Sequence, residues 1–158
     1  RNIAHNLMPG SVDDFGYVSA VESMISAISA ASEVKISFYH NLDKERLQPA
    51  MEVVLFRISQ EAINNILRHA EAAEVCLQLM RYEEDIILTV EDDGKGFDTT
   101  ILSTTTGHYG LTSMENRANA AGGMLSVESH PGKCTLITVE LPINKHAIYE
   151  ANQHTTGR

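Results

Sequence analysis

The order of hydrophobic periodicities along the chain constrains its fold more than any other feature. Apolar residues recur every three or four positions, as on one face of an α-helix, at residues 13–32, 49–70 and 111–121. Alternating or short apolar segments predict β-strands at residues 34–39, 75–79, 86–91, 124–129 and 135–141. The order helix, strand, helix, strand, strand, helix, strand, strand predicts an α/β fold, a two-layer sandwich in which helices cover one face of a mixed β-sheet.

Composition places this sheet and its helices in one globular domain. The chain has 158 residues, of which 21% are charged, and a formal net charge of -9. Without a basic patch to neutralise phosphates, direct binding of nucleic acid is not expected. The two cysteines, Cys76 and Cys134, lie too far apart in sequence for a metal-binding spacing.

The ends of the chain differ from its middle. Residues 1–11 contain Pro9 and Gly10, which favour a break, and residues 146–158 have no clear periodicity. We therefore expect a short lead-in at 1–11, one folded domain at 12–145 and a C-terminal tail at 146–158. The first residue is Arg1 and no stretch is apolar enough to span a membrane, so we expect a cytoplasmic fragment whose parent could be anchored elsewhere.

The predicted helix at residues 49–70 carries polar residues where its apolar face should continue. The apolar row begins at Met51 and reaches Ala62, and Glu61, Asn65 and His69 follow on or beside it. One interpretation is that these side chains bond to backbone or water at the edge of the core. The other is a ligand-facing surface, because an amide oxygen suits Mg²⁺ and a carboxylate can polarise a hydroxyl, a water or an imidazole.

Two glycine-containing segments follow. Asp92 lies at the end of a predicted buried strand, and Gly94 and Gly96 come directly after it. Such a sequence can be a simple turn, or it can leave room for a flat base beside an acceptor-only carboxylate. Residues 107–111 (GHYGL) run into the third predicted helix, whose free N–H groups would favour a phosphate. In this order the three features would cover the metal, base and phosphates of one nucleotide.

These segments resemble the conserved boxes of one ATPase superfamily, the GHKL superfamily. Residues 60–70 (QEAINNILRHA) are similar to its N box, 91–98 (EDDGKGFD) to its G1 box, 107–117 (GHYGLTSMENR) to its G2 box, and 131–135 (PGKCT) to its closing strand motif. The forms of the N and G2 boxes resemble the sensor histidine kinases of the NarX, DesK and LiaS branch. The resemblance implies a Bergerat-type ATP-binding fold and covers about residues 1–145.

The resemblance also implies roles for individual residues. Asn65 would coordinate Mg²⁺ on the phosphates of ATP, and Glu61 would be the catalytic base or polarising residue. Asp92 would accept a hydrogen bond from the adenine amino group, with Gly94 and Gly96 shaping that pocket. Further ATP-binding positions implied at the pocket rim, the lid and the adenine side are Arg68, His69, Lys95, Gly107, His108, Tyr109, Gly110, Leu111 and Thr135.

Two departures from the family pattern stand out. The closing motif usually reads Gly-Thr, whereas this chain has Cys134 before Thr135, so we expect local repacking. No segment resembles the phospho-acceptor box, in which a histidine is followed by an acidic residue on a helix. His5 is followed by Asn6 and lies close to Pro9, so it is not expected to be the acceptor.

The leading hypothesis is therefore the ATP-binding catalytic domain of a histidine kinase. It would donate the γ-phosphate of ATP to a histidine on a separate dimerisation domain, for relay to a response regulator of the LuxR type. Another GHKL ATPase or an anti-sigma serine kinase is the alternative within the fold. A degenerate binding module that does not use ATP is the alternative outside it. Because the dimerising helices have no counterpart in the sequence, we expect a monomer or a weak dimer.

Overall fold

The computed structural model describes residues 10–100 and 109–143, and the elements occur in the predicted order. Three segments lie outside the described part of the chain: residues 1–9, 101–108 and 144–158. The predictions made for His5, Gly107 and His108 therefore concern residues that the structure does not describe. The elements are α1 (Gly10–Ala31), β1 (Lys35–His40), α2 (Pro49–Asn65), η2 (Ile66–Ala70), β2 (Glu74–Arg81), β3 (Asp85–Asp92), α3 (Tyr109–Ala120), β4 (Met124–Ser129) and β5 (Thr135–Pro142).

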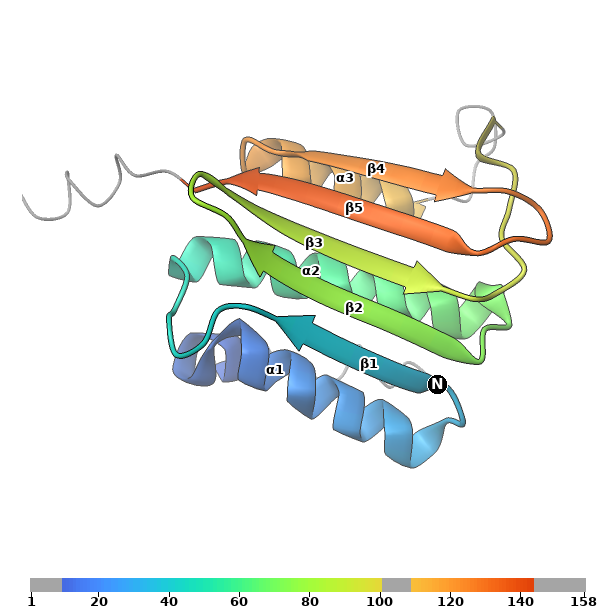
Figure 1. Cartoon of the computed structure of the whole chain (residues 1–158), viewed down its shortest axis with the longest axis horizontal. Coiled ribbons are helices and arrows are strands. Elements are labelled where there is room, and N and C mark those ends of the chain that lie inside the picture. Colours follow the sequence, from blue (N-terminus) through green and yellow to red (C-terminus); the bar gives the residue numbers. More distant parts are fainter. Residues whose placement is uncertain (1–9, 101–108, 144–158) are drawn as a thin grey trace, which may run out of the picture.

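The strands form one mixed sheet with all three α-helices on the same face. The strand order is β1-β2-β3-β5-β4. The β1–β2 pair is parallel, and the β2–β3, β3–β5 and β4–β5 pairs are antiparallel. Figure 1 shows α1 along the β1 edge of the sheet, α2 behind the middle strands and α3 behind β4 and β5. The predicted two-layer α/β sandwich is confirmed.

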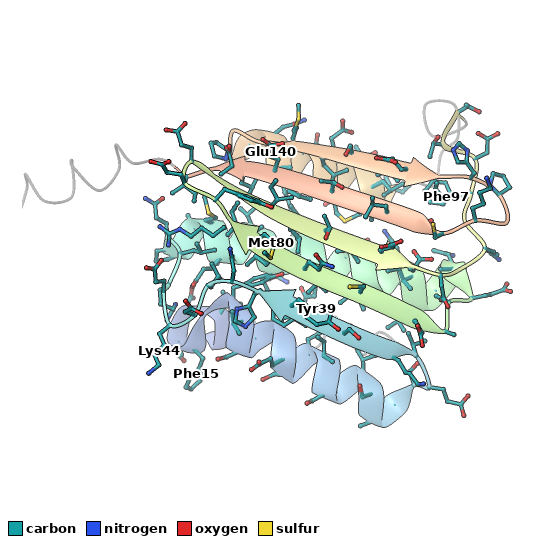
Figure 2. The ribbon with its side chains drawn as sticks, viewed as in Figure 1. Phe15, Tyr39, Lys44, Met80, Phe97 and Glu140 are labelled. Carbon is teal, nitrogen blue, oxygen red and sulfur yellow. The ribbon has the colours of Figure 1, made fainter. Side chains whose placement is uncertain are left out.

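Alternation along the strands explains why only one face is covered. In β3, Ile86, Leu88 and Val90 are buried against the helices, whereas the residues between them are partly exposed. Burying such aliphatic side chains contributes about 1.5–3 kcal/mol each, which drives the helices onto that face. The other face carries Tyr39, Met80 and Glu140, whose side chains stand in front of the sheet in Figure 2.

The first helix differs from its prediction in where it begins and in its shape. It begins at Gly10 rather than near Asp13, and it is kinked at Gly16, whose φ is 85° and ψ 173°. A Cβ on Gly16 would lie 2.7 Å from Nε of Arg46. That guanidinium is held by the buried carboxylate of Glu52 (2.8 Å), which also accepts the backbone N–H of Leu47 (3.2 Å). Glycine at the kink thus leaves space for the arginine that joins the start of α1 to α2.

The second helix also departs from the prediction, since the α-helix ends at Asn65 and its last five residues form a π-helical turn, η2. The turn ends at Glu71, which has a left-handed φ of 54°. A π-turn closes i→i+5 hydrogen bonds, so it shifts the following side chains relative to α-helical spacing. His69 lies on this turn and is exposed, whereas Glu61 and Asn65, with which we expect it to share one surface of the helix, are half-buried.

Candidate functional site

A cleft of about 420 Å³ opens where the C-terminal end of α2 and η2, the loop after β3 and the start of α3 meet. This is the right-hand end of the molecule in Figure 1, where β3 ends and β5 begins. Nine of the residues singled out in the sequence line it: Asn65, Arg68, His69, Asp92, Lys95, Gly96, Gly110, Leu111 and Thr135. Asn65 and Asp92, on different elements, thus face one shared cavity.

Three other expected residues lie beside the cleft rather than in its lining. Gly94 belongs to the loop under Asp92, and Glu61 lies one helical turn before Asn65. Tyr109, at the start of α3, is 77% exposed and lines a separate shallow depression on the outside of that helix. The implied place of Tyr109 in the lid of an ATP site therefore stays a prediction.

The loop after β3 is held by close backbone contacts that require glycine. A Cβ on Gly94 would overlap the carbonyl oxygen of Ala70. Gly96 has a φ of 60°, and a Cβ there would overlap the carbonyl oxygens of His130 and Lys133. Glycine is the residue that adopts such a φ without a steric penalty. The loop is therefore wedged between the end of η2 and the turn that joins β4 to β5.

Backbone hydrogen bonds of Lys95 hold the loop after β3 on both sides. Its N–H donates to the carbonyl of Ala70 (2.8 Å), and its carbonyl accepts the N–H of Gly132 (2.6 Å). The side chain of Lys95 turns outward to Glu71, with Nζ to Oε1 2.9 Å apart, in an exposed ion pair. Such surface pairs contribute little to stability, so the backbone contacts are what hold the loop.

The two adjacent aspartates of this loop have opposite environments. Asp93 is on the surface, where it accepts the N–H groups of Glu74 (2.9 Å) and Ala73 (2.8 Å); these bonds lower its pKa. Asp92 is 3% exposed and faces the cleft. Burial raises the pKa of Asp92 above its usual value, although a hydrogen bond from the N–H of Gly94 (2.8 Å) opposes this shift. Asp93 fastens β2 to the loop, and Asp92 keeps acceptor capacity for a ligand.

Glu61 and Asn65 meet the first turn of α3 at Gly110. A Cβ on Gly110 would lie 2.5 Å from Oε1 of Glu61 and 2.9 Å from Nδ2 of Asn65. The carboxylate and the amide are therefore directed at the backbone that begins α3, one helical turn apart on α2. This places a candidate base and a candidate metal ligand side by side at the mouth of the cleft.

The rim of the cleft carries positive charge. Arg68 and His69, both exposed on η2, line the same cavity as Asn65. Lys95 lines it as well, although its ammonium pairs with Glu71 at the end of η2. The guanidinium of Arg68 suits a ligand that carries phosphates, since its N–H groups can form charge-assisted hydrogen bonds with phosphate oxygens.

The apolar walls of the cleft and the buried hydroxyl of Ser129 were not predicted from the sequence. The walls are formed by Ala62, Ile66, Ala70, Phe97 and Ile137. These residues are of the same types as ordinary core residues, so the sequence does not mark them as part of a site. For Ile137 alone there was a signal, because side chains alternate along β5 and Ile137 therefore shares a face with Thr135. Figure 2 shows Phe97 at this end of the sheet. Apolar walls with a few placed polar groups are typical of a site for a flat organic ring.

Comparison with known proteins agrees with this geometry. Residues 50–145 match the sequence profile of the family described as histidine kinase-, DNA gyrase B-, and HSP90-like ATPase. The chain belongs to this family. The family assignment implies that the domain binds ATP, and the matched region contains every cleft-lining residue named above.

Full-length relatives of this family domain are much longer than the chain. It is 29% identical over 143 residues to the signal transduction histidine-protein kinase/phosphatase DegS of Brevibacillus brevis, covering 90% of this chain and 36% of that protein. It is 33% identical over 143 residues to the signal transduction histidine-protein kinase/phosphatase UhpB of Salmonella typhimurium, covering 90% of this chain and 28% of that protein. The chain thus spans about a third of the length of these curated relatives.

Solved structures support the fold of this ATPase-family domain. The histidine kinase domain of the Erythrobacter litoralis EL346 blue-light activated histidine kinase superposes with a TM-score of 0.65 at 20% identity, covering 82% of this chain and 66% of that one. The Acinetobacter baumannii histidine kinase AdeS gives a TM-score of 0.66 at 14% identity, covering 87% and 74%.

The described residues contain neither a protein-only metal cluster nor a membrane-spanning helix. Among them, no three His, Cys, Asp or Glu side chains come close enough to bind a metal ion by themselves. No helix in residues 10–100 or 109–143 has the length and apolar character needed to cross a bilayer.

Gly110→Ala tests the contact between α3 and α2. We expect ATP affinity to fall about tenfold or more, because the new methyl group must displace Glu61 or Asn65 from the cleft mouth. Alanine favours a helix over glycine, so the thermal midpoint should not fall with the affinity. Asn116→Ala, exposed on the same helix, is the matched control. Unchanged affinity in Gly110→Ala would contradict the contact.

Asp92→Asn tests the electrostatic cost of the buried carboxylate. A carboxyl whose pKa is raised by folding destabilises the folded state above that pKa, and this penalty disappears as the pH falls below the unfolded value of about 3.9. The asparagine variant should therefore have the higher thermal midpoint at pH 7, and the difference should shrink toward pH 4. A variant that is equally destabilised at both pH values would show that Asp92 is a structural anchor.

Proposed function

We propose that residues 12–145 form the ATP-binding catalytic domain of a sensor histidine kinase. The observation that carries this proposal is the shared cleft, in which the carboxylate of Asp92 and the amide of Asn65 approach one cavity from β3 and α2. The relatives named as signal transduction histidine-protein kinases support the same reading. The lead-in predicted at residues 1–11, whose last two residues already belong to α1, would then connect to an upstream helix, and residues 146–158 would form a tail.

In this proposal the base of ATP enters the deep end of the cleft. Asp92 accepts from the amino group of adenine with the oxygen that does not take the Gly94 N–H. Gly96 lets the ring approach the backbone, while Ile66 and Ile137 enclose its faces. Gly94, though outside the lining, keeps the loop against Ala70 and so sets the direction of Asp92.

The phosphates lie toward the cleft mouth. Asn65 would hold Mg²⁺ through its amide oxygen, and the bound metal would neutralise charge on the phosphates. Arg68 adds positive charge at the rim, where His69 and Lys95 would also meet the phosphates. Gly110 and Leu111, at the start of α3, line the same space, and free N–H groups at a helix start would favour a phosphate. Gly107, His108 and Tyr109 would belong to the lid of this site.

Transfer of the γ-phosphate would use an imidazole supplied by a separate dimerisation domain. The phosphorus–oxygen bond to ADP breaks and a phosphorus–nitrogen bond to the histidine forms. The carboxylate of Glu61, beside Asn65 at the mouth, orients the imidazole and accepts its proton. The phosphohistidine then serves a response regulator, for which the resemblance of the N and G2 boxes favours the LuxR type. The domain would act in the cytoplasm without direct nucleic-acid contact, as a monomer or weak dimer.

Calorimetry with ATP, with and without Mg²⁺, tests this proposal. The unmutated domain should bind ATP more tightly with Mg²⁺. Asn65→Ala should remove the gain due to Mg²⁺ and keep the metal-free affinity, whereas Asp92→Ala should weaken binding about 10- to 100-fold under both conditions, as expected for a lost charged hydrogen bond. Asn119→Ala, exposed on α3, is the control. No binding heat from the unmutated domain would contradict the proposal and favour a binding module that does not use ATP.

A further inference from the structure

Ser129, the last residue of β4, is a buried hydroxyl behind the base end of the cleft. Its side chain is 2% exposed, and β4–β5 pairing sets it opposite Thr135. Its Oγ lies 2.8 Å from Oγ1 of Thr135 and accepts the N–H of Phe97 at 3.0 Å. Ser129 does not line the cleft, whereas both of its partners do.

The direction of the Ser129–Thr135 hydrogen bond follows from counting protons. A serine hydroxyl has one proton to donate, and a buried hydroxyl that donates to nothing is destabilising. The N–H of Phe97 is itself a donor and cannot take the proton. Among the described residues, Oγ1 of Thr135 is the acceptor that remains for it. Ser129 therefore donates to Thr135, and the proton of Thr135 is left for another acceptor.

The hydroxyl proton of Thr135 can be donated to a ligand in the cleft. Thr135 lines the cavity beside Asp92, to which it is paired directly across β3 and β5. Asp92, when ionised, can only accept. This end of the cleft therefore combines an acceptor on β3 with a donor on β5.

We propose that Ser129 is a positioning residue that turns the hydroxyl of Thr135 into a hydrogen-bond donor toward the ring nitrogen next to the amino group of the bound base. The inference rests on the proposed function, because it takes ATP as the ligand. Adenine matches the pair, since its amino group donates and the ring nitrogens near it, N1 and N7, accept. Guanine, with a carbonyl oxygen in place of that amino group, does not.

A purely structural role is the alternative, because Ser129 also ties the Phe97 backbone to the sheet. Loss of that tie would disturb the whole loop after β3, and so would weaken every nucleotide by a similar factor. Loss of a donor directed by Ser129 would instead weaken only those nucleotides that have the ring nitrogen. Analogues in which one ring nitrogen is replaced by carbon separate the two roles.

The experiment compares ATP, 1-deaza-ATP and 7-deaza-ATP on the unmutated domain and on Ser129→Ala. We expect Ser129→Ala to weaken ATP about three- to tenfold, the range of one net hydrogen bond. It should leave the affinity for one of the two analogues unchanged, and that analogue identifies the nitrogen contacted. Thr135→Val should show the same selectivity, and the double variant should be little weaker than either single one. Ser126→Ala, exposed on the same strand, is the control.

The outcomes distinguish this inference from the proposed function. An equal loss for all three nucleotides in Ser129→Ala, or no loss for ATP, would overturn the positioning role while the unmutated domain still binds ATP. Additive effects of Ser129→Ala and Thr135→Val would overturn it as well, because the two hydroxyls would then act separately. Failure of the unmutated domain to bind ATP would instead remove the proposed function itself.

Discussion

The contact on which the rest of the site depends is the insertion of the loop after β3 between two backbone surfaces. Gly94 lies against the carbonyl of Ala70, and Gly96 against the carbonyls of His130 and Lys133. No side chain fits at either position, so the loop closes only with glycine there. Because it joins η2 to the β4–β5 turn, this insertion sets the distance between the wall that carries Asn65 and the wall that carries Thr135. A ligand site at this edge of the sheet is therefore built by backbone packing before any polar group acts.

The polar groups around that loop divide into those that stabilise the fold and those left for a ligand. The carboxylate of Asp93 accepts hydrogen bonds from backbone N–H groups at the start of β2, which lowers its pKa. Asp92 is instead buried, with a raised pKa and a single hydrogen bond from the N–H of Gly94. Ser129 and Thr135 show the same division between a buried partner and a cleft-facing one. Functional sites commonly keep such incompletely satisfied groups at some cost in stability, and here they cluster at one end of one cleft.

Much of this could be predicted from the sequence, because hydrophobic periodicity is a local signal. The order of helices and strands, the layering and the convergence of Asn65 and Asp92 followed from periodicity and from the resemblance of three boxes. The π-turn at Ile66–Ala70 could not be predicted, since its residues are ordinary helix formers and the turn depends on how Ala70 meets the loop at Lys95. Ser129 was missed because a serine ending a strand looks solvent-facing until its partner strand is known. Gly16 was likewise read as part of a regular helix, although Arg46 makes it a kink.

A crystal structure of the domain with Mg²⁺ and a non-hydrolysable ATP analogue tests the central claim most directly. The account predicts the amino group of adenine within hydrogen-bonding distance of the free carboxylate oxygen of Asp92, and the metal on the amide oxygen of Asn65, with one nucleotide spanning the cleft between them. A nucleotide bound elsewhere on the domain, or bound here with its phosphates at Asp92 and its base at Asn65, would contradict it.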